Sequence, residues 1–316
     1  MDQEQLNIRH TPVMLHEVLE HLIPAEGNIR VIDGTLGFGG HCEAILKHNS
    51  AAIVLGLDRD SEAIESSQHR FGMMEDRVII HKAKFSEMSD VAYAIGWEKV
   101  DAILLDIGVS SVQIDEGYRG FSFRKNGPLD MRMDASQDTT AAKILNRKSI
   151  EELTAIFRNY GEIDGAMKLA RAIVSRRTTR SWASTEEFSQ LCEDVVPSPR
   201  RNAPPVSTLC FQALRIAVND ELIQLEKAVE KGISILNKGG RIGVISYHSL
   251  EDRIVKNIFR RESTDCLCSK KLPICRCGHK ASIKLVTKKP LEPSQTEIIN
   301  NRRAAAAKFR IAEKIT

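Results

Sequence analysis

Short apolar runs alternate with amphipathic helical patterns over the first third of the chain. Between the runs, His41–His48 and Ser61–Phe71 have helical periodicity, and Asp60 is a suitable N-cap for the second helix. The apolar runs have the length and composition of buried strands: Ile29–Asp33, Ala51–Asp58, Val78–His81 and Val100–Asp106. Buried strands that alternate with helices predict a parallel sheet covered on both faces.

The pattern then changes to helices alone from Thr139 to about Arg201. After several prolines, Phe211–Leu236 predicts one long amphipathic helix, followed by a strand at Arg241–Ser246 and a helix at Leu250–Arg261. This order predicts an α/β fold with an inserted helical domain. We expect residues 1–112 and 211–316 to form the α/β domain, and residues 113–210 to form the insertion, a candidate RNA-recognition domain.

Charge is distributed unevenly along this chain, although its net charge is only +3. Residues 1–112 carry 9 Lys and Arg against 18 Asp and Glu, whereas residues 253–316 carry 16 against 5. A basic C-terminal segment on an otherwise acidic chain favours a polyanionic partner, nucleic acid first, with a merely solvated tail as the alternative. No secretory signal or membrane-spanning apolar run is recognisable, so we expect a cytoplasmic protein without membrane contact.

A glycine-rich turn between the first strand and its helix is the strongest local signal for a ligand. It reads DGTLGFGGH over Asp33–His41, and Asp58 ends the second strand, where a carboxylate can accept hydrogen bonds from ribose hydroxyls. A nicotinamide-dinucleotide oxidoreductase would need a third glycine where Cys42 follows Gly37 and Gly39. The pattern therefore favours S-adenosylmethionine, which has no pyrophosphate.

Two further residues stand where a methyltransferase would need them. Phe85 follows the third strand and could face adenine, although core packing is an equal alternative. Asp106 ends the fourth strand, at the sheet edge where open α/β folds bind ligands. Its carboxylate could accept hydrogen bonds from the cofactor or from an amino group that is methylated.

Distinctive motifs lie along nearly the whole chain: His10–Leu15, Asp33–His41, Leu57–Asp60, Leu105–Ser111 with Gln113, Arg119–Phe123, Pro128–Asp134, Phe211–Ile216 and Ser246–Lys256. They resemble the motifs of the RsmH (MraW) family of 16S ribosomal RNA cytosine-N(4) methyltransferases. The resemblance implies a class I, Rossmann-like S-adenosylmethionine-dependent methyltransferase fold with a helical insertion. It also implies methylation of a cytidine 4-amino nitrogen in the decoding region of the assembled small ribosomal subunit. The cofactor contacts that it implies are Gly39, Gly40, His41, Asp58, Phe85, Asp106 and Gln113.

Two stretches depart from the family pattern. Leu209 and Cys210 stand where the family usually has arginine and threonine, and alanines within Ala304–Ala307 replace an arginine and a serine. The first change puts an RNA or active-site contact in doubt. Together the changes indicate a diverged member of the family.

The catalytic hypothesis concerns two aspartates. Either Asp106 or Asp130 is expected to contact the cytidine amino group, with Ser110 and His248 lining the pocket; for Asp130 an ion pair with Arg132 is the alternative. Positioning an acceptor beside the developing positive charge matters more for this reaction than a strong base.

Phosphate contacts are expected from basic residues of the insertion and the C-terminal segment. The candidates in the insertion are Arg171, Arg176, Arg177 and Arg180. A non-catalytic ribosome-assembly factor that binds RNA would also explain the basic residues, but it would not need the complete set of cofactor motifs. A methyltransferase that acts on DNA or protein is the remaining rival.

Four of the seven cysteines form a cluster in the sequence, as Cys266-x-Cys268 and Cys275-x-Cys277, followed by His279. Thiolates and imidazole are natural zinc ligands, but a single residue within each pair is shorter than the usual spacing. The family resemblance implies no metal. No metal site is therefore assigned from the sequence, and zinc and reduced cysteines in a basic loop both stay open.

Overall fold

The computed structural model describes residues 12–197, 204–269 and 275–316. His10 and Thr11 of the first family motif lie outside these ranges. The chain divides into two compact units, which are described separately: unit 1 comprises Met1–Gly108 and Leu222–Thr316, and unit 2 comprises Val109–Glu221. Among the described residues, no helix is long and apolar enough to cross a membrane.

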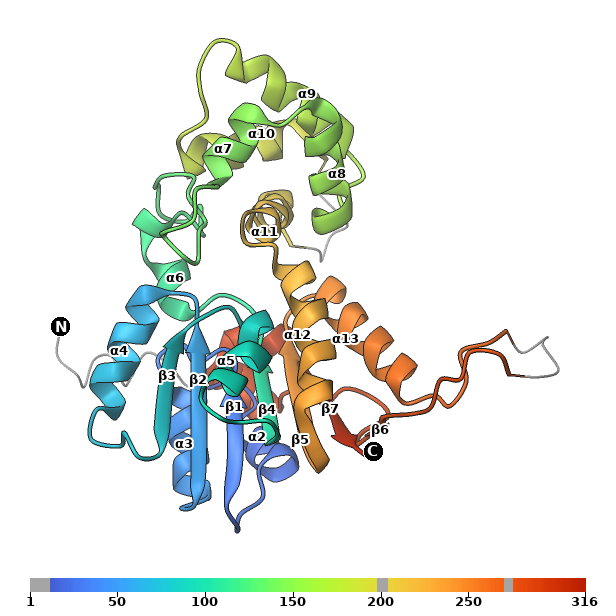
Figure 1. Cartoon of the computed structure of the whole chain (residues 1–316). Helices are drawn as coiled ribbons and strands as arrows, with labels where there is room; N and C mark the ends of the chain where they lie inside the picture. Colours follow the sequence, from blue (N-terminus) through green and yellow to red (C-terminus); the bar gives the residue numbers. More distant parts are fainter. Residues whose placement is uncertain (1–11, 198–203, 270–274) are drawn as a thin grey trace. The chain divides into compact units, whose positions relative to one another are not determined.

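Unit 1 is built on a seven-stranded sheet with the order β3-β2-β1-β4-β5-β7-β6 (Figure 1). Its first five strands are parallel neighbours: β1 (Ile29–Asp33), β2 (Ala52–Asp58), β3 (Val78–Lys82), β4 (Val100–Asp106) and β5 (Leu236–Ser246). The expected parallel sheet is thus confirmed. Because β1 stands between β2 and β4, the carboxyl ends of these three strands lie next to one another.

Helices cover both faces of this sheet because successive strand residues point to opposite sides. Ile32 and Leu105 pack in one apolar core, whereas Val31 and Leu104 pack in the other. The first core is covered by α5 (Met88–Ala94), α12 (Glu221–Ile235) and α13 (Ser249–Glu262). The second is covered by α2 (Leu15–Leu22), α3 (Gly40–His48) and α4 (Ser61–Phe71).

The basic C-terminal segment is part of the sheet. After α13, the chain adds β6 (Ile283–Leu285), α14 (Gln295–Asn300) and β7 (Lys308–Lys314), and β7 runs antiparallel between β5 and β6. Arg310 on β7 forms a two-pronged ion pair with Asp252 on α13, at 2.6 and 3.1 Å. The alternative of a merely solvated basic tail is therefore wrong for β7, whose Arg310 links the strand to α13.

Unit 2 is helical, as expected for the middle of the chain. Its main helices surround a core that contains Phe157, Trp182, Phe188 and Phe211. These helices are α7 (Ala141–Arg147), α8 (Ile150–Gly161), α9 (Ala166–Arg177), α10 (Thr185–Val195) and α11 (Val206–Asn219), preceded by the short α6 (Ser111–Asp115).

The single helix expected over Phe211–Leu236 is two helices, α11 and α12. Asp220 between them has a left-handed backbone (φ 51°, ψ 33°), and its N–H donates to the carbonyl of Ile216. The side chain of the preceding Asn219 is buried and bonds the backbone of Met131 and Met133. The expected domain boundary between residues 210 and 211 consequently falls inside α11, and the chain passes between units after residues 108 and 221.

Candidate active site

The glycine-rich turn lies at the carboxyl end of β1 and leads into α3. Gly39 is the N-cap of α3 and has φ 81°, a conformation that side chains rarely adopt. A Cβ atom on Gly39 would lie 2.4 Å from the ring of Phe71, so the turn has no room for one. The turn therefore brings bare backbone and the free N–H groups of a helix N-terminus to the sheet edge, which suits a ligand carboxylate.

Asp58 at the end of β2 holds this turn in place. Its Oδ2 accepts the N–H of Gly37 at 2.9 Å, and its Oδ1 accepts the N–H of Asp60 at 2.8 Å. Burial of the carboxylate raises the pKa of Asp58, and backbone hydrogen bonds from Asp60, Gly37 and Arg59 oppose that effect. A carboxylate has about four acceptor sites, so these donors leave room for a hydrogen bond from a ligand hydroxyl.

Asp106 at the end of β4 is the centre of a polar group. The hydroxyl of Tyr247, just beyond β5, donates to Asp106 Oδ1 at 2.7 Å, and Nδ1 of His41 lies 3.8 Å from Oδ2. The backbone N–H of Asp106 donates to the Thr35 hydroxyl at 2.7 Å. Although 23% of its side chain stays exposed, burial of the carboxylate raises the pKa of Asp106, opposed by His41 and Tyr247.

Asp33 is almost completely buried, with 1% exposure. Its Oδ1 accepts the N–H of Thr35 at 3.2 Å, whereas its Oδ2 has no hydrogen-bond partner among the described residues. Burial raises its pKa to about 6; His41 and the Thr35 N–H lower it, and Asp106 raises it. Neither Asp33 nor Tyr247 was assigned a role from the sequence, although both follow strand ends, the one signal that could have identified them.

Phe85 begins a short 3-10 helix after β3. It packs against the core formed with α5 and α12, and its Cβ would lie 3.3 Å from a Cβ atom on Gly34. The Phe85 Cβ therefore lies close to Gly34 of the glycine-rich turn, and the side chain also contributes to packing. Both interpretations of Phe85 from the sequence are compatible with this position.

His248 is the N-cap of α13. Its Nδ1 accepts the N–H of Glu251 at 3.4 Å, and its Nε2 lies 3.0 Å from the buried Glu251 carboxylate. Glu251 in turn accepts the backbone N–H of Tyr247 at 2.8 Å. This arrangement positions the strand end that carries Tyr247, and it gives His248 a structural task besides the expected one in the pocket.

Ser110 and Gln113 lie in unit 2 and cap α6. The Ser110 hydroxyl accepts the N–H of Gln113 at 3.2 Å, and the Gln113 side chain accepts the N–H of Ser110 at 3.0 Å. This reciprocal pair is a capping box, which stabilises the first turn of a helix. The roles expected for Ser110 in the pocket and for Gln113 in cofactor binding stay predictions.

Asp130, also in unit 2, forms the ion pair that the sequence left open. Arg132 donates to both carboxylate oxygens of Asp130, at 2.7 and 2.8 Å, and its backbone N–H donates as well, at 3.1 Å. Burial raises the pKa of Asp130, but the bonds from Arg132 prevail and the pKa is lowered overall. The Asp130 carboxylate therefore stabilises the local fold through its ion pair with Arg132.

The four arginines expected to bind phosphate do not act as one set. Arg176 bonds Glu187 and stacks 4.0 Å from the centre of the Trp182 ring, and Arg177 donates to the carbonyls of Leu145 and Lys148. Arg180 also pairs with Glu187, but its side chain is 72% exposed. Arg171 is exposed and makes no ion pair within the described part of the chain.

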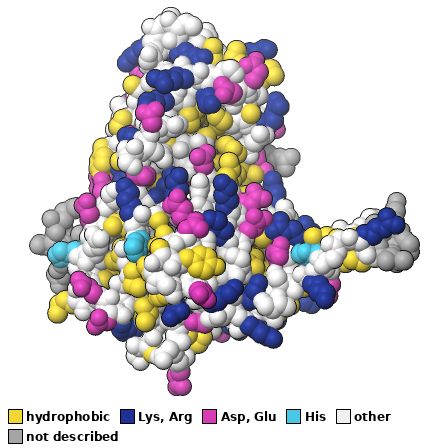
Figure 2. Space-filling view, in the orientation of Figure 1, with side chains coloured by type: hydrophobic (Ala, Val, Ile, Leu, Met, Phe, Trp, Pro, Cys, Tyr) yellow, Lys and Arg dark blue, Asp and Glu magenta, His cyan; other side chains and the backbone are white. Residues whose placement is uncertain are grey.

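On the face that Figure 2 shows, Lys and Arg side chains are interspersed with Asp and Glu. Because their side chains are exposed, Arg171 and Arg180 are the two of these four arginines best placed to contact an external phosphate.

Only the first departure from the family pattern lies in a core. Cys210 is fully buried in the core of unit 2, and Leu209 packs against that core, so both have a packing role. In the second stretch, the alanines that replace the arginine and the serine are Ala305 and Ala306, and both are exposed. These two replacements therefore remove polar side chains from the surface and have no packing role.

Comparison with known proteins gives the chain its family. The model of the MraW methylase family matches residues 7–315. The ribosomal RNA small subunit methyltransferase H of Carboxydothermus hydrogenoformans is 46% identical over 98% of this chain and 99% of the relative. The protein of the same name from Oleidesulfovibrio alaskensis is 46% identical over 97% of this chain and 95% of its own.

Solved structures add a weaker likeness. An rRNA methylase from Streptococcus thermophilus has a TM-score of 0.40 and 10% identity, with 96% of this chain and 95% of that chain covered. A SAM-dependent O-methyltransferase from Thermotoga maritima has a TM-score of 0.41 and 12% identity, with 99% and 70% covered. Scores this low do not support an argument, and the assignment rests on the sequence matches. By the extent and identity of those matches, the chain belongs to the MraW methylase family.

Proposed function

We propose that this protein transfers a methyl group from S-adenosylmethionine to the 4-amino nitrogen of a cytidine in small-subunit ribosomal RNA. The observation that carries the proposal is the row of carboxylates at the ends of β1, β2 and β4 beside the glycine-rich turn. Membership of the MraW methylase family and the names of the relatives supply the substrate class. The proposed partner is the small ribosomal subunit, and the proposed place of action is therefore the cytoplasm.

The residues of unit 1 fit the cofactor. Gly40 begins α3 directly after the N-cap Gly39, so its backbone N–H has no partner within the helix. Asp58 retains acceptor capacity for a ribose hydroxyl. Phe85 stands beside the turn, where an apolar ring can contact adenine. When bound, S-adenosylmethionine supplies an electrophilic methyl group on a sulfonium.

Asp106 is the group that we assign to the amino acceptor. As positive charge develops on the cytidine nitrogen, a carboxylate that accepts a hydrogen bond from one of its N–H groups stabilises that charge. Burial raises the pKa of Asp106, so it also becomes a better acceptor for the proton that the nitrogen loses. Tyr247 fixes one oxygen by donating to it, which leaves the other, Oδ2, beside His41.

Unit 2 is the proposed RNA-recognition domain. Exposed Arg171 and Arg180 are suited to phosphate contacts, which position an RNA without reading its sequence. This assignment rests on exposure and charge in a unit that carries none of the acidic strand ends.

The direct test is methyl transfer from labelled S-adenosylmethionine to small subunits from a strain that lacks this gene, followed by nucleoside analysis. We expect label in N(4)-methylcytidine. Cofactor binding without transfer to any acceptor would instead favour the assembly-factor alternative, and label in DNA or protein alone would refute the proposed substrate.

The role of Asp106 is tested by single-turnover transfer with Asp106→Asn and, as a matched control, Asp101→Asn on the same strand. Asparagine keeps the size but is a weaker acceptor, so we expect Asp106→Asn to lower the rate by about 100-fold or more. Asp101 is at the opposite end of β4, where it bonds Arg30 and Asn237, and its replacement should leave the rate nearly unchanged. A near-normal rate for Asp106→Asn would exclude the assigned role.

A further inference from the structure

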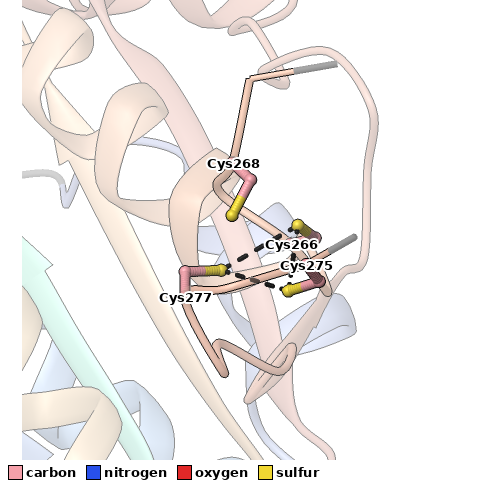
Figure 3. A group of neighbouring side chains, drawn as sticks. All are labelled: Cys266, Cys268, Cys275 and Cys277. Atoms are coloured by element: carbon pink, nitrogen blue, oxygen red, sulfur yellow. Dashed lines mark hydrogen bonds between the residues drawn. The ribbon is translucent and has the colours of Figure 1, made fainter. Parts of the chain in front are cut away.

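Four cysteine side chains converge in the loop that joins α13 to β6 (Figure 3). Their Sγ atoms all lie within 4.8 Å of one another, and none of the four cysteines is in a disulfide. The group consists of Cys266, Cys268, Cys275 and Cys277, from the two described arms of the loop. Nothing in the proposed methyl transfer uses these thiols.

The spacing of the sulfurs matches a tetrahedral metal site. The distance from Sγ of Cys275 is 3.4 Å to Cys266 and 3.6 Å to Cys277, and the distance between Cys266 and Cys277 is 3.9 Å. Four sulfurs at about 2.3 Å from a central zinc ion are about 3.8 Å apart. A disulfide needs about 2.05 Å, and the larger body of an iron–sulfur cluster would hold its sulfurs further apart.

The two arms of the loop are aligned antiparallel. The N–H of Leu267 donates to Cys277 Sγ at 3.3 Å, and the N–H of Arg276 donates to Cys268 Sγ at 3.4 Å. At the base of the loop, the N–H of Ser282 donates to the carbonyl of Glu262 at 2.8 Å. Backbone donors aimed at sulfur stabilise thiolates, as hydrogen bonds around metal-bound cysteines do.

The alignment of the two arms explains how cysteine pairs separated by only one residue can bind one ion. Side chains two residues apart lie on the same face of an extended chain, so a Cys-x-Cys pair can direct both thiols the same way. Two such pairs on facing arms supply four ligands without the longer spacer of other zinc motifs.

Apolar burial does not account for the cluster. Cys275 and Cys277 are exposed, and Leu267 between the other two cysteines is 47% exposed. The described part of this loop contributes no residue to the apolar cores before Ile283, and for such a segment a bound metal is a usual source of folding free energy.

His279 lies outside the ligand set. Its Nε2 is 3.0 Å from the carbonyl of Arg261 at the end of α13; since a carbonyl can only accept, the ring nitrogen donates this bond. The imidazole is thereby used to attach the loop to the helix, and four thiolates complete a tetrahedron without it.

We propose that Cys266, Cys268, Cys275 and Cys277 bind one zinc ion as four thiolates. With all four positions taken by protein, the site is structural, and it holds together the basic loop between α13 and β6. Binding displaces the thiol protons to solvent and involves no change of oxidation state.

The first experiment measures metals in tag-free protein purified without chelator, by mass spectrometry. We expect about one zinc per chain in the parent protein and at least a tenfold lower content in Cys275→Ser and Cys277→Ser. Arg276→Ala, between the two replaced cysteines, keeps the backbone donor and is the matched control; it should retain zinc, and so should His279→Ala.

A second measurement needs no variant. Cobalt added to metal-free protein should give the ligand-field and sulfur charge-transfer absorption typical of tetrahedral thiolate coordination, and zinc should displace it. Protein that takes up neither metal, iron in place of zinc, disulfides among these cysteines on peptide mapping, or zinc retained in both cysteine variants would each overturn the proposal.

Discussion

Replacing Asp33 with asparagine is expected to stabilise unit 1 above pH 6, although Asp33 lies in the candidate active site. Asparagine has the same shape and keeps an oxygen that can accept the N–H of Thr35. What it removes is a negative charge from a place with 1% exposure, where one carboxylate oxygen has no partner among the described residues.

The magnitude follows from linkage between protonation and folding. Burial raises the pKa of Asp33 from 3.8 to about 6, which corresponds to about 3 kcal/mol. Because the folded-state pKa is the higher one, the stability that protonated Asp33 contributes is fully present below about pH 4 and is lost as the pH rises through 6. Roughly half of this contribution is already lost at pH 5, so the stability advantage of Asp33→Asn should grow by about 1.5 kcal/mol between pH 5 and pH 8.

The assay is urea unfolding followed by tryptophan fluorescence. Trp97 is buried in unit 1 and Trp182 in unit 2, so a Trp182→Phe background reports unit 1 alone. Asp76→Asn, which removes an exposed carboxylate of unit 1, controls for the general change in net charge. A stability difference that stays constant or shrinks from pH 5 to pH 8 would refute the reasoning about Asp33.

Three further predictions concern the site and unit 2. Tyr247→Phe removes a hydrogen-bond donor that lowers the pKa of Asp106. We expect the single-turnover rate to fall about tenfold and the acid limb of the pH–rate profile to move to higher pH. An acid limb at the same pH would contradict this. Asp130→Asn breaks the ion pair with Arg132, so unfolding followed by Trp182 should show a loss of about 1 kcal/mol while methyl transfer stays near normal; normal stability with a collapsed rate would instead restore Asp130 as a catalytic candidate. Arg171→Ala should weaken small-subunit binding and reduce the slope of the logarithm of the binding constant against the logarithm of salt concentration by about 1. Arg177→Ala makes the same change of charge but should mainly lower the stability of unit 2. Equal slopes for the two variants would contradict the distinction.

Local patterns were sufficient for the first half of the sheet. The ends of β1 and β4 and the cap of α4 by Asp60 were expected from the sequence and found at the same residues. These features depend on contacts within a few residues, such as helix caps and the alternation of buried side chains. For the same reason, the glycine-rich turn, Asp58 and Asp106 could be placed at one sheet edge.

Features that join distant segments were not recoverable in this way. Strand β7 has a mixed, basic sequence (KFRIAEK), and it belongs to the sheet because it pairs with β5 and β6. Tyr247 donates a hydrogen bond to Asp106, which lies 141 residues earlier in the chain. The two arms of the cysteine loop are joined by hydrogen bonds from backbone N–H groups of one arm to cysteine sulfurs of the other.

A single left-handed residue, Asp220, ends α11 without interrupting the apolar periodicity that continues into α12. Periodicity records which side of an element is buried. Which partner covers that side, and which polar groups meet there, depends on the free energy of packing segments that are far apart in the chain.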